Sequence, residues 1–436
     1  MGNTSSRRAA ACLTALALLI ASLALALPAR SDAADKGVVT DLTWGISAAD
    51  QDRTAAAMKD VGATSVRLSM SWSDAEPQRG AYSAYWFAQY DRAVALSRAN
   101  GAQVVFMVYQ SPSWASGSSN PDTKPRDPAD YANFVRYVAA RYAGRVQAYE
   151  IWNEQNFSRF WPTGPNPAEY TSLLKAAYPA VKQSDPAATV LMGGLSANDY
   201  DYLQGMYDAG ARPYFDGANV HPYTGANDPT LCWNQAGTAR KARDAFCGYE
   251  EVYATMSRNG DAGKGLWMTE MGYSTTSAKY GVSKDRQAEY LVKAYRRLEQ
   301  HPYVRAMFWY QLRNYSPGGA NLGSWRANLG LLRTDYSKKP AYDALKGYTS
   351  AASAKAGLRR PERGTVARRG EAHLLVRQEP RPQRQRKRKR RPRHREGGVP
   401  HRRTDGGQRQ LGSLRHDVVR LQEDGLRQPH RQCGCL

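Results

Sequence analysis

Short apolar runs alternate with amphipathic segments between residues 37 and 347. Apolar runs rich in β-branched and aromatic residues predict strands, whereas apolar positions spaced three and four residues apart predict helices. The pattern predicts eight strands, at residues 38–44, 64–70, 103–109, 146–152, 189–193, 215–221, 265–270 and 304–310. The helices expected between them lie at residues 49–61, 85–100, 129–142, 168–182, 240–258 and 284–300.

This alternation is typical of a parallel sheet wrapped by helices. Eight repeats predict an α/β fold of the (β/α)8 TIM barrel type, which we place at residues 35–350. The alternative is a doubly wound open sheet, which usually carries a glycine-rich phosphate-binding loop after its first strand. The residues at that point, Trp44, Gly45 and Ile46, form no such loop. The sequence therefore favours the barrel.

Two arginines, Arg7 and Arg8, precede an uncharged apolar run at residues 9–27, which small residues follow. A charged start, an apolar middle and a small-residue end are typical of a secretory signal peptide, which we place at residues 1–34. The alternative is a membrane anchor, since about 20 apolar residues can span a bilayer. The alanine-rich composition favours a cleaved signal. We therefore expect a secreted, extracellular protein without a stable membrane anchor.

Cys232 and Cys247 are the cysteine pair in the body of the chain. In a secreted protein such a pair predicts a disulfide, and closing a loop of this size contributes about 3 kcal/mol. Two free buried thiols are the alternative. No His or Cys stands beside the pair, and only His221 and His301 lie outside the C-terminal tail. We therefore expect neither a metal site nor a cofactor.

The net charge of +22 is concentrated at the C-terminus. Residues 355–436 contain 24 of the 61 Lys and Arg but 8 of the 39 Asp and Glu, which leaves 37 against 31 in residues 1–354. The segment at residues 351–436 is rich in Arg and Pro and lacks aromatic residues after Lys355, which predicts a disordered basic tail.

Two interpretations of this tail remain. One is a basic arm that binds nucleic acid or an anionic polymer. The other, which the composition favours, is an out-of-frame translation of GC-rich DNA. Because the body of the chain has little excess charge, nucleic acid is not the expected partner.

Charged and aromatic residues fall at the ends of the predicted strands. Glu154 follows the fourth strand, His221 and Tyr223 lie at the end of the sixth, Glu270 ends the seventh, and Trp309 lies near the end of the eighth. In a barrel these ends meet at one mouth, where catalytic residues lie. Two carboxylates at that mouth suit glycosidic bond cleavage, because one protonates the leaving oxygen while the other attacks or stabilises the sugar cation.

Alternate residues of a strand share a face, so Glu150, Trp152 and Glu154 point the same way if the fourth strand continues that far. Glu150 then lies deeper in the barrel, where an unpaired charge is costly. Arg67, on the second strand, is its expected partner. A buried ion pair and a catalytic role both fit these two residues, and Arg67 can also hold Glu270 ionised.

The strand-end motifs, taken in order, resemble those of the retaining glycoside hydrolases of clan A, particularly families 5 and 39. The motifs are Trp-Asn-Glu at 152–154, His-Pro-Tyr at 221–223, Thr-Glu-Met-Gly at 269–272 and Trp at 309. The resemblance covers roughly residues 37–348. It implies an enzyme that hydrolyses O-glycosyl bonds, with Glu154 as general acid and base, Glu270 as nucleophile, and Asn153 binding the sugar 2-hydroxyl. Many relatives have a proline where this chain has Gln155.

Further side chains are expected to bind the substrate. Arg67 and Tyr223 would stabilise the charge on Glu270, with His221 at the same mouth, and Trp309 would offer a flat face to the sugar. Tryptophans in strand-following loops are expected either to stack on sugar rings or to close the top of the barrel. These are Trp72, Trp114, Trp161, Trp233 and Trp325, and of them Trp72 and Trp114 are expected to bind the substrate.

We therefore expect a secreted, monomeric retaining hydrolase that acts by double displacement on a β-linked polysaccharide or oligosaccharide, cellulase-like or similar to family 39. The alternative is a carbohydrate-binding barrel that has lost catalysis. The presence of both glutamates and Asn153 disfavours that alternative.

Overall fold

The computed structural model describes residues 34–314 and 324–358. Residues 1–33 of the predicted signal peptide and residues 359–436 of the predicted tail lie outside the described residues. Within the described part, no helix combines the length and the apolar character needed to cross a membrane.

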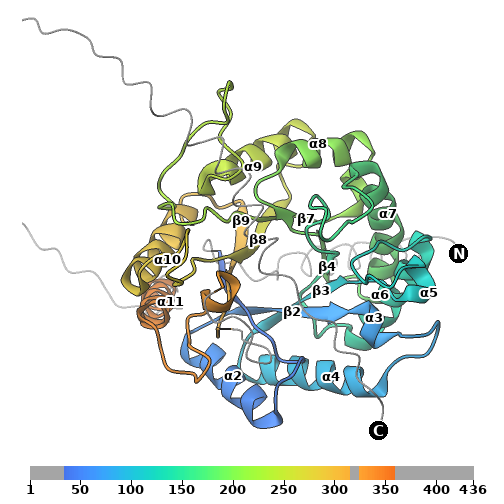
Figure 1. The fold of residues 1–436 in the computed structure, drawn as a ribbon, viewed down its shortest axis with the longest axis horizontal. Helices are drawn as coiled ribbons and strands as arrows, with labels where there is room; N and C mark the ends of the chain where they lie inside the picture. Colours follow the sequence, from blue (N-terminus) through green and yellow to red (C-terminus); the bar gives the residue numbers. More distant parts are fainter. Residues whose placement is uncertain (1–33, 315–323, 359–436) are drawn as a thin grey trace, which may run out of the picture.

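The strands form a closed parallel barrel surrounded by helices (Figure 1). Apart from the short strand β6, each strand pairs with the next one along the chain, so that β5 pairs with β7, and β1 pairs with β9 to close the barrel. A short strand, β6 (Leu195–Ser196), pairs with the end of β7. The barrel strands are β1 (Asp35–Val39), β2 (Ser65–Ser71), β3 (Gln103–Tyr109), β4 (Ala148–Ile151), β5 (Thr189–Met192), β7 (Gly217–His221), β8 (Gly265–Met271) and β9 (Val304–Tyr310). The predicted (β/α)8 barrel is confirmed.

The helices begin at capping residues and cover the outside of the barrel (Figure 1). Ser47, Asn166 and Ser283 each accept a hydrogen bond from a backbone N–H in the following first turn, which stabilises the start of a helix. The helices are α2 (Ala48–Asp60), α3 (Trp72–Ala75), α4 (Ala84–Ala99), α5 (Ser113–Ser116), α6 (Pro128–Tyr142), α7 (Pro167–Ser184), α8 (Tyr200–Asp208), α9 (Tyr249–Arg258), α10 (Lys284–Leu298) and α11 (Pro340–Leu358). Helix α11 continues past residue 350, where the barrel domain was expected to end.

The first strand is shorter at its carboxyl end than the pattern predicts. Strand β1 ends at Val39 because Asp41 forms a turn, in which its Oδ1 atom accepts hydrogen bonds from the backbone N–H groups of Thr43 (2.9 Å) and Trp44 (2.8 Å). Trp44 therefore lies in the loop after β1 and not in the strand.

The loop between β7 and α9 carries the Cys232–Cys247 disulfide, as the sequence predicted. The chain next forms a short 3-10 helix, η2 (Phe246–Gly248), and α9 begins only at Tyr249. The helix expected from residue 240 is therefore shorter, because its first part belongs to the disulfide-closed loop.

The inside of the barrel changes from apolar to polar along the strands. A small apolar cluster fills part of it, formed by Val39, Val105, Ala148, Leu191, Trp267, Ala306 and Phe308. Two residues further along, on the same strand face, Ala148 is followed by Glu150 and Trp267 by Thr269, and both polar residues are buried. The larger apolar cluster lies between strands and helices. The buried polar residues are therefore nearer the carboxyl ends of the strands.

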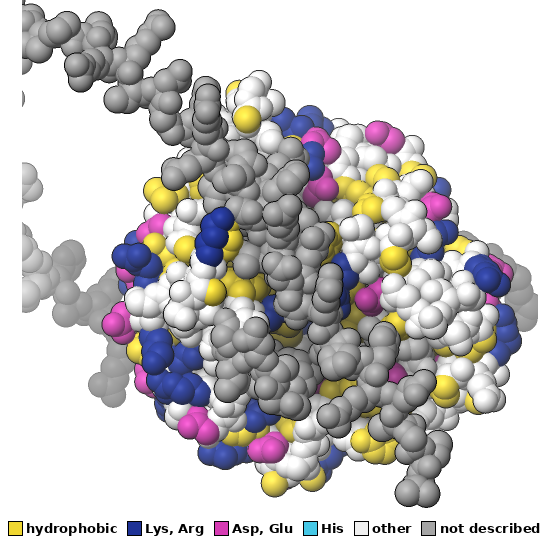
Figure 2. Space-filling model, viewed as in Figure 1, with side chains coloured by type: hydrophobic (Ala, Val, Ile, Leu, Met, Phe, Trp, Pro, Cys, Tyr) yellow, Lys and Arg dark blue, Asp and Glu magenta, His cyan; other side chains and the backbone are white. Residues whose placement is uncertain are grey.

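On the face shown in Figure 2, the Lys and Arg side chains of the described residues are interspersed with Asp and Glu. No continuous basic surface is visible among the described residues on that face. This distribution agrees with the small excess of positive charge counted in the body of the chain.

Candidate active site

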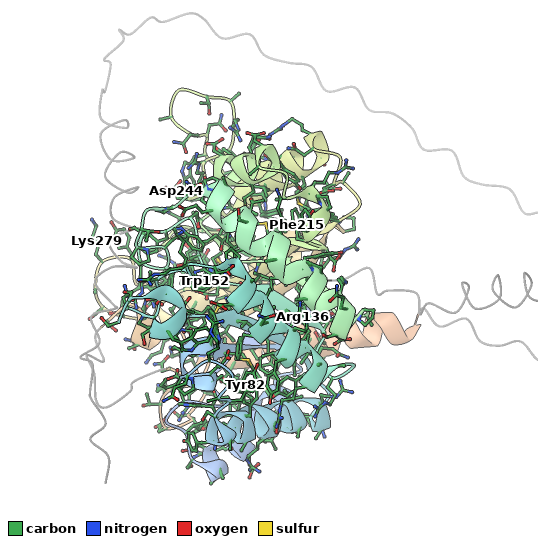
Figure 3. The ribbon with its side chains drawn as sticks, turned by 90° about the vertical axis from the view of Figure 1, so that its right-hand side faces the viewer. Tyr82, Arg136, Trp152, Phe215, Asp244 and Lys279 are labelled. Atoms are coloured by element: carbon green, nitrogen blue, oxygen red, sulfur yellow. A yellow bond between two sulfur atoms is a disulfide. The ribbon has the colours of Figure 1, made fainter. Side chains whose placement is uncertain are left out.

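Loops that follow the strands surround a cleft of about 340 Å³. In Figure 3 these loops lie on the left, where Asp244 and Lys279 are labelled, whereas Arg136 lies on the outer helix α6. A polar cleft at this end of a barrel is the usual place for a ligand. Five of the predicted site residues line it: Arg67, Asn153, Glu154, Tyr223 and Glu270.

Glu154 reaches the cleft through an unusual backbone conformation. Strand β4 ends at Ile151, and both Trp152 (φ 72°) and Glu154 (φ 41°) have positive φ. The side chain of Trp152 consequently packs against Tyr131 of α6, with the rings 6.0 Å apart, and its Nε1 donates to the carbonyl of Phe160 in the following loop at 2.8 Å. The expectation that Glu150, Trp152 and Glu154 share one face was wrong for Trp152, because the strand does not continue that far.

Glu150 and Arg67 form a buried ion pair, which is one of the two roles that the sequence left open for them. Arg67 Nε donates to Glu150 Oε2 at 2.7 Å, and Arg67 Nη2 donates to Oε1 at 3.0 Å. The backbone N–H of Gly194 also donates to Glu150 Oε1 at 3.0 Å. A buried charge is tolerated only when its hydrogen-bonding atoms have such partners.

The same guanidinium reaches two further residues of the cleft. Arg67 Nη1 donates to Glu270 Oε1 at 2.7 Å, and Nη2 donates to Asn153 Oδ1 at 2.9 Å. The second contact fixes the orientation of the Asn153 amide. Its Nδ2 group therefore remains as the donor for a ligand in the cleft.

Glu270 is held as a carboxylate by its surroundings. Its Oε2 atom accepts a hydrogen bond from Tyr223 Oη at 2.9 Å. Burial raises the pKa of Glu270, but the charges of His221 and Arg67, together with the Tyr223 hydrogen bond, lower it by more. The pKa of Glu270 therefore lies below its ordinary value.

His221 lies behind Glu154 and is fully buried. Its Nδ1 atom is 3.0 Å from Glu154 Oε1, and its Nε2 atom is 3.0 Å from Thr269 Oγ1. Burial lowers the pKa of His221, but the carboxylates of Glu270 and Glu154 outweigh burial, so the pKa lies above its ordinary value. His221 does not line the cleft, which corrects the expectation that it binds the substrate directly.

Thr269 and Asn219 complete this arrangement, and sequence reasoning missed both. Asn219 Nδ2 donates to Thr269 Oγ1 at 2.8 Å, and Thr269 Oγ1 lies within 3.0 Å of Asn219 Oδ1. Both are inward-facing positions next to predicted site residues, since Thr269 precedes Glu270 and Asn219 lies two residues before His221. That position was the signal that could have found them.

Trp309 does not face the cleft, and the prediction that it contacts the sugar was wrong. It is fully buried between β9 and the helices, and its Nε1 donates to the carbonyl of Leu329 at 3.3 Å. Side chains alternate along a strand, so the next residue, Tyr310, faces inward and lines the cleft.

Most of the loop tryptophans pack the top of the barrel. Trp72 is fully buried and Trp114 is half-buried, and the two rings meet edge to face at 5.5 Å. Both indole nitrogens bond to Glu76, Trp72 to its side chain and Trp114 to its carbonyl. These two tryptophans therefore hold loops together and do not line the cleft, contrary to the prediction.

The remaining tryptophans divide between the two expectations. Trp161 and Trp233 do not line the cleft, whereas Trp325 lines it and meets the Tyr223 ring at 5.3 Å. Trp44, in the loop after β1, also lines the cleft. Trp44 was not expected there because its loop was predicted to be strand.

The two candidate catalytic carboxylates lie close together. One oxygen atom of Glu154 and one of Glu270 lie within 4.8 Å of each other and of a His221 nitrogen. Each oxygen of Glu270 and each nitrogen of His221 already has a hydrogen-bonding partner in the protein. The arrangement provides two neighbouring carboxylates with different surroundings at one cleft.

Comparisons with known proteins agree on a glycoside hydrolase fold. A family 39 glycoside hydrolase from the gut symbiont Bacteroides cellulosilyticus WH2 superposes with a TM-score of 0.61 and 25% sequence identity, covering 74% of this chain. This chain spans 65% of the length of that protein. No curated protein sequence matched the chain.

Two other solved structures, each 18% identical, share the fold. A monomeric β-xylosidase from Caulobacter crescentus CB15 gives a TM-score of 0.58 and covers 73% of this chain and 68% of its own. A family 5, subfamily 18 enzyme from Streptomyces cattleya, in complex with GlcNAc, gives 0.59 and covers 76% and 82%. The sequence profile of the cellulases, glycosyl hydrolase family 5, matches residues 31–313, which is more than half of the chain. The chain therefore belongs to glycosyl hydrolase family 5, a family of glycosidases.

Proposed function

We propose that this protein is a retaining β-glycosidase that acts on a polysaccharide or oligosaccharide. The observation that carries the proposal is the separation of Glu154 and Glu270, whose nearest carboxylate oxygens lie within 4.8 Å. Retaining glycosidases hold their two carboxyl groups about 5–5.5 Å apart, whereas inverting enzymes hold them about 6.5–9.5 Å apart to admit a water molecule. Oxygens this close leave less room for an intervening water molecule than an inverting enzyme needs, which favours double displacement.

Glu270 is the proposed nucleophile. Its lowered pKa keeps it ionised, and Arg67 and Tyr223 hold its two oxygens in a fixed orientation. A Glu270 oxygen attacks the anomeric carbon and forms an ester bond to it, while the bond between that carbon and the leaving oxygen breaks.

Glu154 is the proposed general acid and base. Its proton passes to the leaving oxygen in the first step. In the second step Glu154 takes a proton from water as the water oxygen attacks the anomeric carbon, and the bond to Glu270 breaks. His221, 3.0 Å from Glu154 Oε1, orients this carboxyl group.

Asn153 and the cleft aromatics are proposed to position the sugar. The Asn153 amide is oriented by Arg67, so its Nδ2 group can donate to a hydroxyl next to the reacting carbon. Tyr310 and Trp325 line the same cleft and offer aromatic surface to the ring. Two of the proteins that share this fold are a β-xylosidase and an exo-β-1,4-mannosidase. Both names denote enzymes that hydrolyse β-linked glycosides.

We also propose that the protein is secreted and acts as a monomer. The signal-like N-terminal sequence and the Cys232–Cys247 disulfide support export, because disulfides persist in oxidising compartments.

Hydrolysis of a panel of β-glucans, mannans and xylans by the purified protein tests the proposal, with NMR of the first product to show whether the anomeric configuration is retained. Inverted products would contradict the mechanism. Binding of a polysaccharide without any cleavage would instead favour a carbohydrate-binding barrel that has lost catalysis.

A further inference from the structure

Three aromatic side chains form a continuous row that begins in the cleft and ends at the first turn of α4. Trp44 lines the cleft and is 40% exposed. Its ring lies 4.5 Å from that of Trp86, and the Trp86 ring lies 5.2 Å from that of Tyr85, which is 63% exposed. We call Trp44, Trp86 and Tyr85 the aromatic row.

The exposure of this row is unusual for the molecule. Among the described residues, three large hydrophobic side chains are exposed, and two of them, Trp44 and Tyr85, belong to the row. The third, Leu231, directly precedes the disulfide-bonded Cys232 in the loop between β7 and α9. Single exposed apolar residues need no explanation, but adjoining ones often mark a ligand-binding surface.

The rings of the row are held in place by the fold. The backbone N–H of Trp44 donates to Asp41 Oδ1 at 2.8 Å, which fixes the backbone from which the first ring of the row projects. Trp86 packs on the buried Tyr90 at 6.4 Å, which fixes the middle. A surface fixed before binding loses little conformational entropy when a ligand covers it.

A polar group stands where the row meets the cleft. Asp41 lines the cleft, and its hydrogen bonds from Thr43 and Trp44 all go to Oδ1. No described residue donates a hydrogen bond to Oδ2, so this oxygen can accept one from a hydroxyl group. Aromatic faces beside a carboxylate match a sugar unit, which has apolar ring faces and hydroxyl edges.

We infer that the aromatic row binds further sugar units of the same polysaccharide chain whose bond is cleaved in the cleft. This inference rests on the proposed glycosidase function. It is supported by the continuity of the row with the cleft through Trp44, which belongs to both. The substrate is then a chain that is long enough to leave the cleft and reach the first turn of α4.

Chain-length dependence of hydrolysis tests the inference. We measure kcat/KM for oligosaccharides of increasing length, from two units upward, taken from the polysaccharide that the protein cleaves best. In the wild-type protein kcat/KM should continue to rise with length. Tyr85→Ala and Trp44→Ala should each lower kcat/KM for the longest substrate about threefold to tenfold, and by less for the disaccharide.

Leu231→Ala is the matched control, because it removes the other exposed large hydrophobic side chain. It should change neither the rate nor its dependence on length. A kcat/KM that does not rise with length, or an equal loss at all lengths in Tyr85→Ala and Trp44→Ala, would overturn the inference. Thermal unfolding of each variant identifies any loss that comes from misfolding.

Affinity electrophoresis of the full chain separates this inference from the proposed function. Native gels contain β-glucan, mannan or xylan at graded concentrations. If no polysaccharide is cleaved, the proposed function fails. Binding of sugar by the aromatic row would still be supported if a polysaccharide slows migration of the wild-type protein and of Leu231→Ala but not of Tyr85→Ala. The inference would be overturned if no gel retarded the wild-type protein, or if Tyr85→Ala and Leu231→Ala were retarded equally.

Discussion

His221 Nδ1 lies 3.0 Å from Glu154 Oε1, and the same imidazole lies 3.9 Å from Glu270 Oε2. One buried ring therefore contacts the proposed acid and base while its charge acts on the proposed nucleophile. The charge of His221 is one reason for the low pKa of Glu270.

Replacing His221 with Asn should move the acidic limb of the pH profile of kcat/KM to higher pH. Without the imidazolium, the pKa of Glu270 rises, so more of the nucleophile is protonated and inactive at low pH. The profile is measured on a short chromogenic substrate. His301→Asn is the control, because His301 lies outside the cleft; an unshifted acidic limb in His221→Asn would show that the charge does not act on the nucleophile.

Glu154→Gln should lower kcat about 10²–10⁴-fold on natural glycosides, because the leaving oxygen loses its proton donor. The loss should be smaller for aryl glycosides with acidic leaving groups, since these need little protonation. Comparison of the two substrate types separates loss of the acid from loss of binding. Glu289→Gln, an exposed glutamate, should leave both rates unchanged, and a fully active Glu154→Gln would remove the assignment.

Glu270 should become covalently labelled by a 2-deoxy-2-fluoroglycoside with a good leaving group, because the fluorine slows hydrolysis of the glycosyl ester. Peptide mass spectrometry should locate the added sugar on the peptide that contains Glu270. Glu270→Gln should show no label. A label on any other residue would overturn the assignment of the nucleophile.

Arg67→Met should lower the free energy of unfolding by about 3–5 kcal/mol, because it leaves the buried Glu150 without its partner. Adding Glu150→Gln should recover part of that loss, since the unpaired charge is then removed. Urea unfolding measures both variants. Asp52→Asn breaks an exposed ion pair with Arg92 and should cost about 0–1 kcal/mol; an equal loss at both positions would contradict the buried pair.

Removing the disulfide by Cys232→Ser and Cys247→Ser should lower the free energy of unfolding by about 3 kcal/mol, because the unfolded chain loses a closed loop. The cleft should keep its activity, since neither cysteine lines it. Urea unfolding and hydrolysis rates are measured on the same sample. Unchanged stability in the double variant would show that the loop is held by other contacts.

Much of the site follows from where the strands end. Apolar runs that stop at Glu154 and Glu270 were enough to place both carboxylates at one mouth, because all strands of a parallel barrel end on the same side. The Arg67–Glu150 pair also followed, because a buried charge requires a partner. These arguments use local sequence and one general rule of the fold.

Which side chains point into the barrel was harder to predict. Residues 304–310 are apolar on both faces apart from Arg305, so the sequence does not tell whether Trp309 or Tyr310 points inward. The place of His221 behind Glu154 depends on contacts with Thr269 on the next strand, and these follow from strand register and not from local pattern. Helix α8 was missed because its sequence is rich in Tyr and contains Gly205.

Trp152, two residues before Glu154, is anchored in the helix layer by its bond to Phe160 and its edge-to-face contact with Tyr131. The position of the proposed acid therefore depends on the core residue Tyr131 and on the carbonyl of Phe160, which lies in the cleft-lining loop after β4. Loops that do not contact residues 152–160 can change in length or sequence while this carboxylate stays in place. The fold can therefore acquire new substrate specificities through those loops without altering its catalytic chemistry.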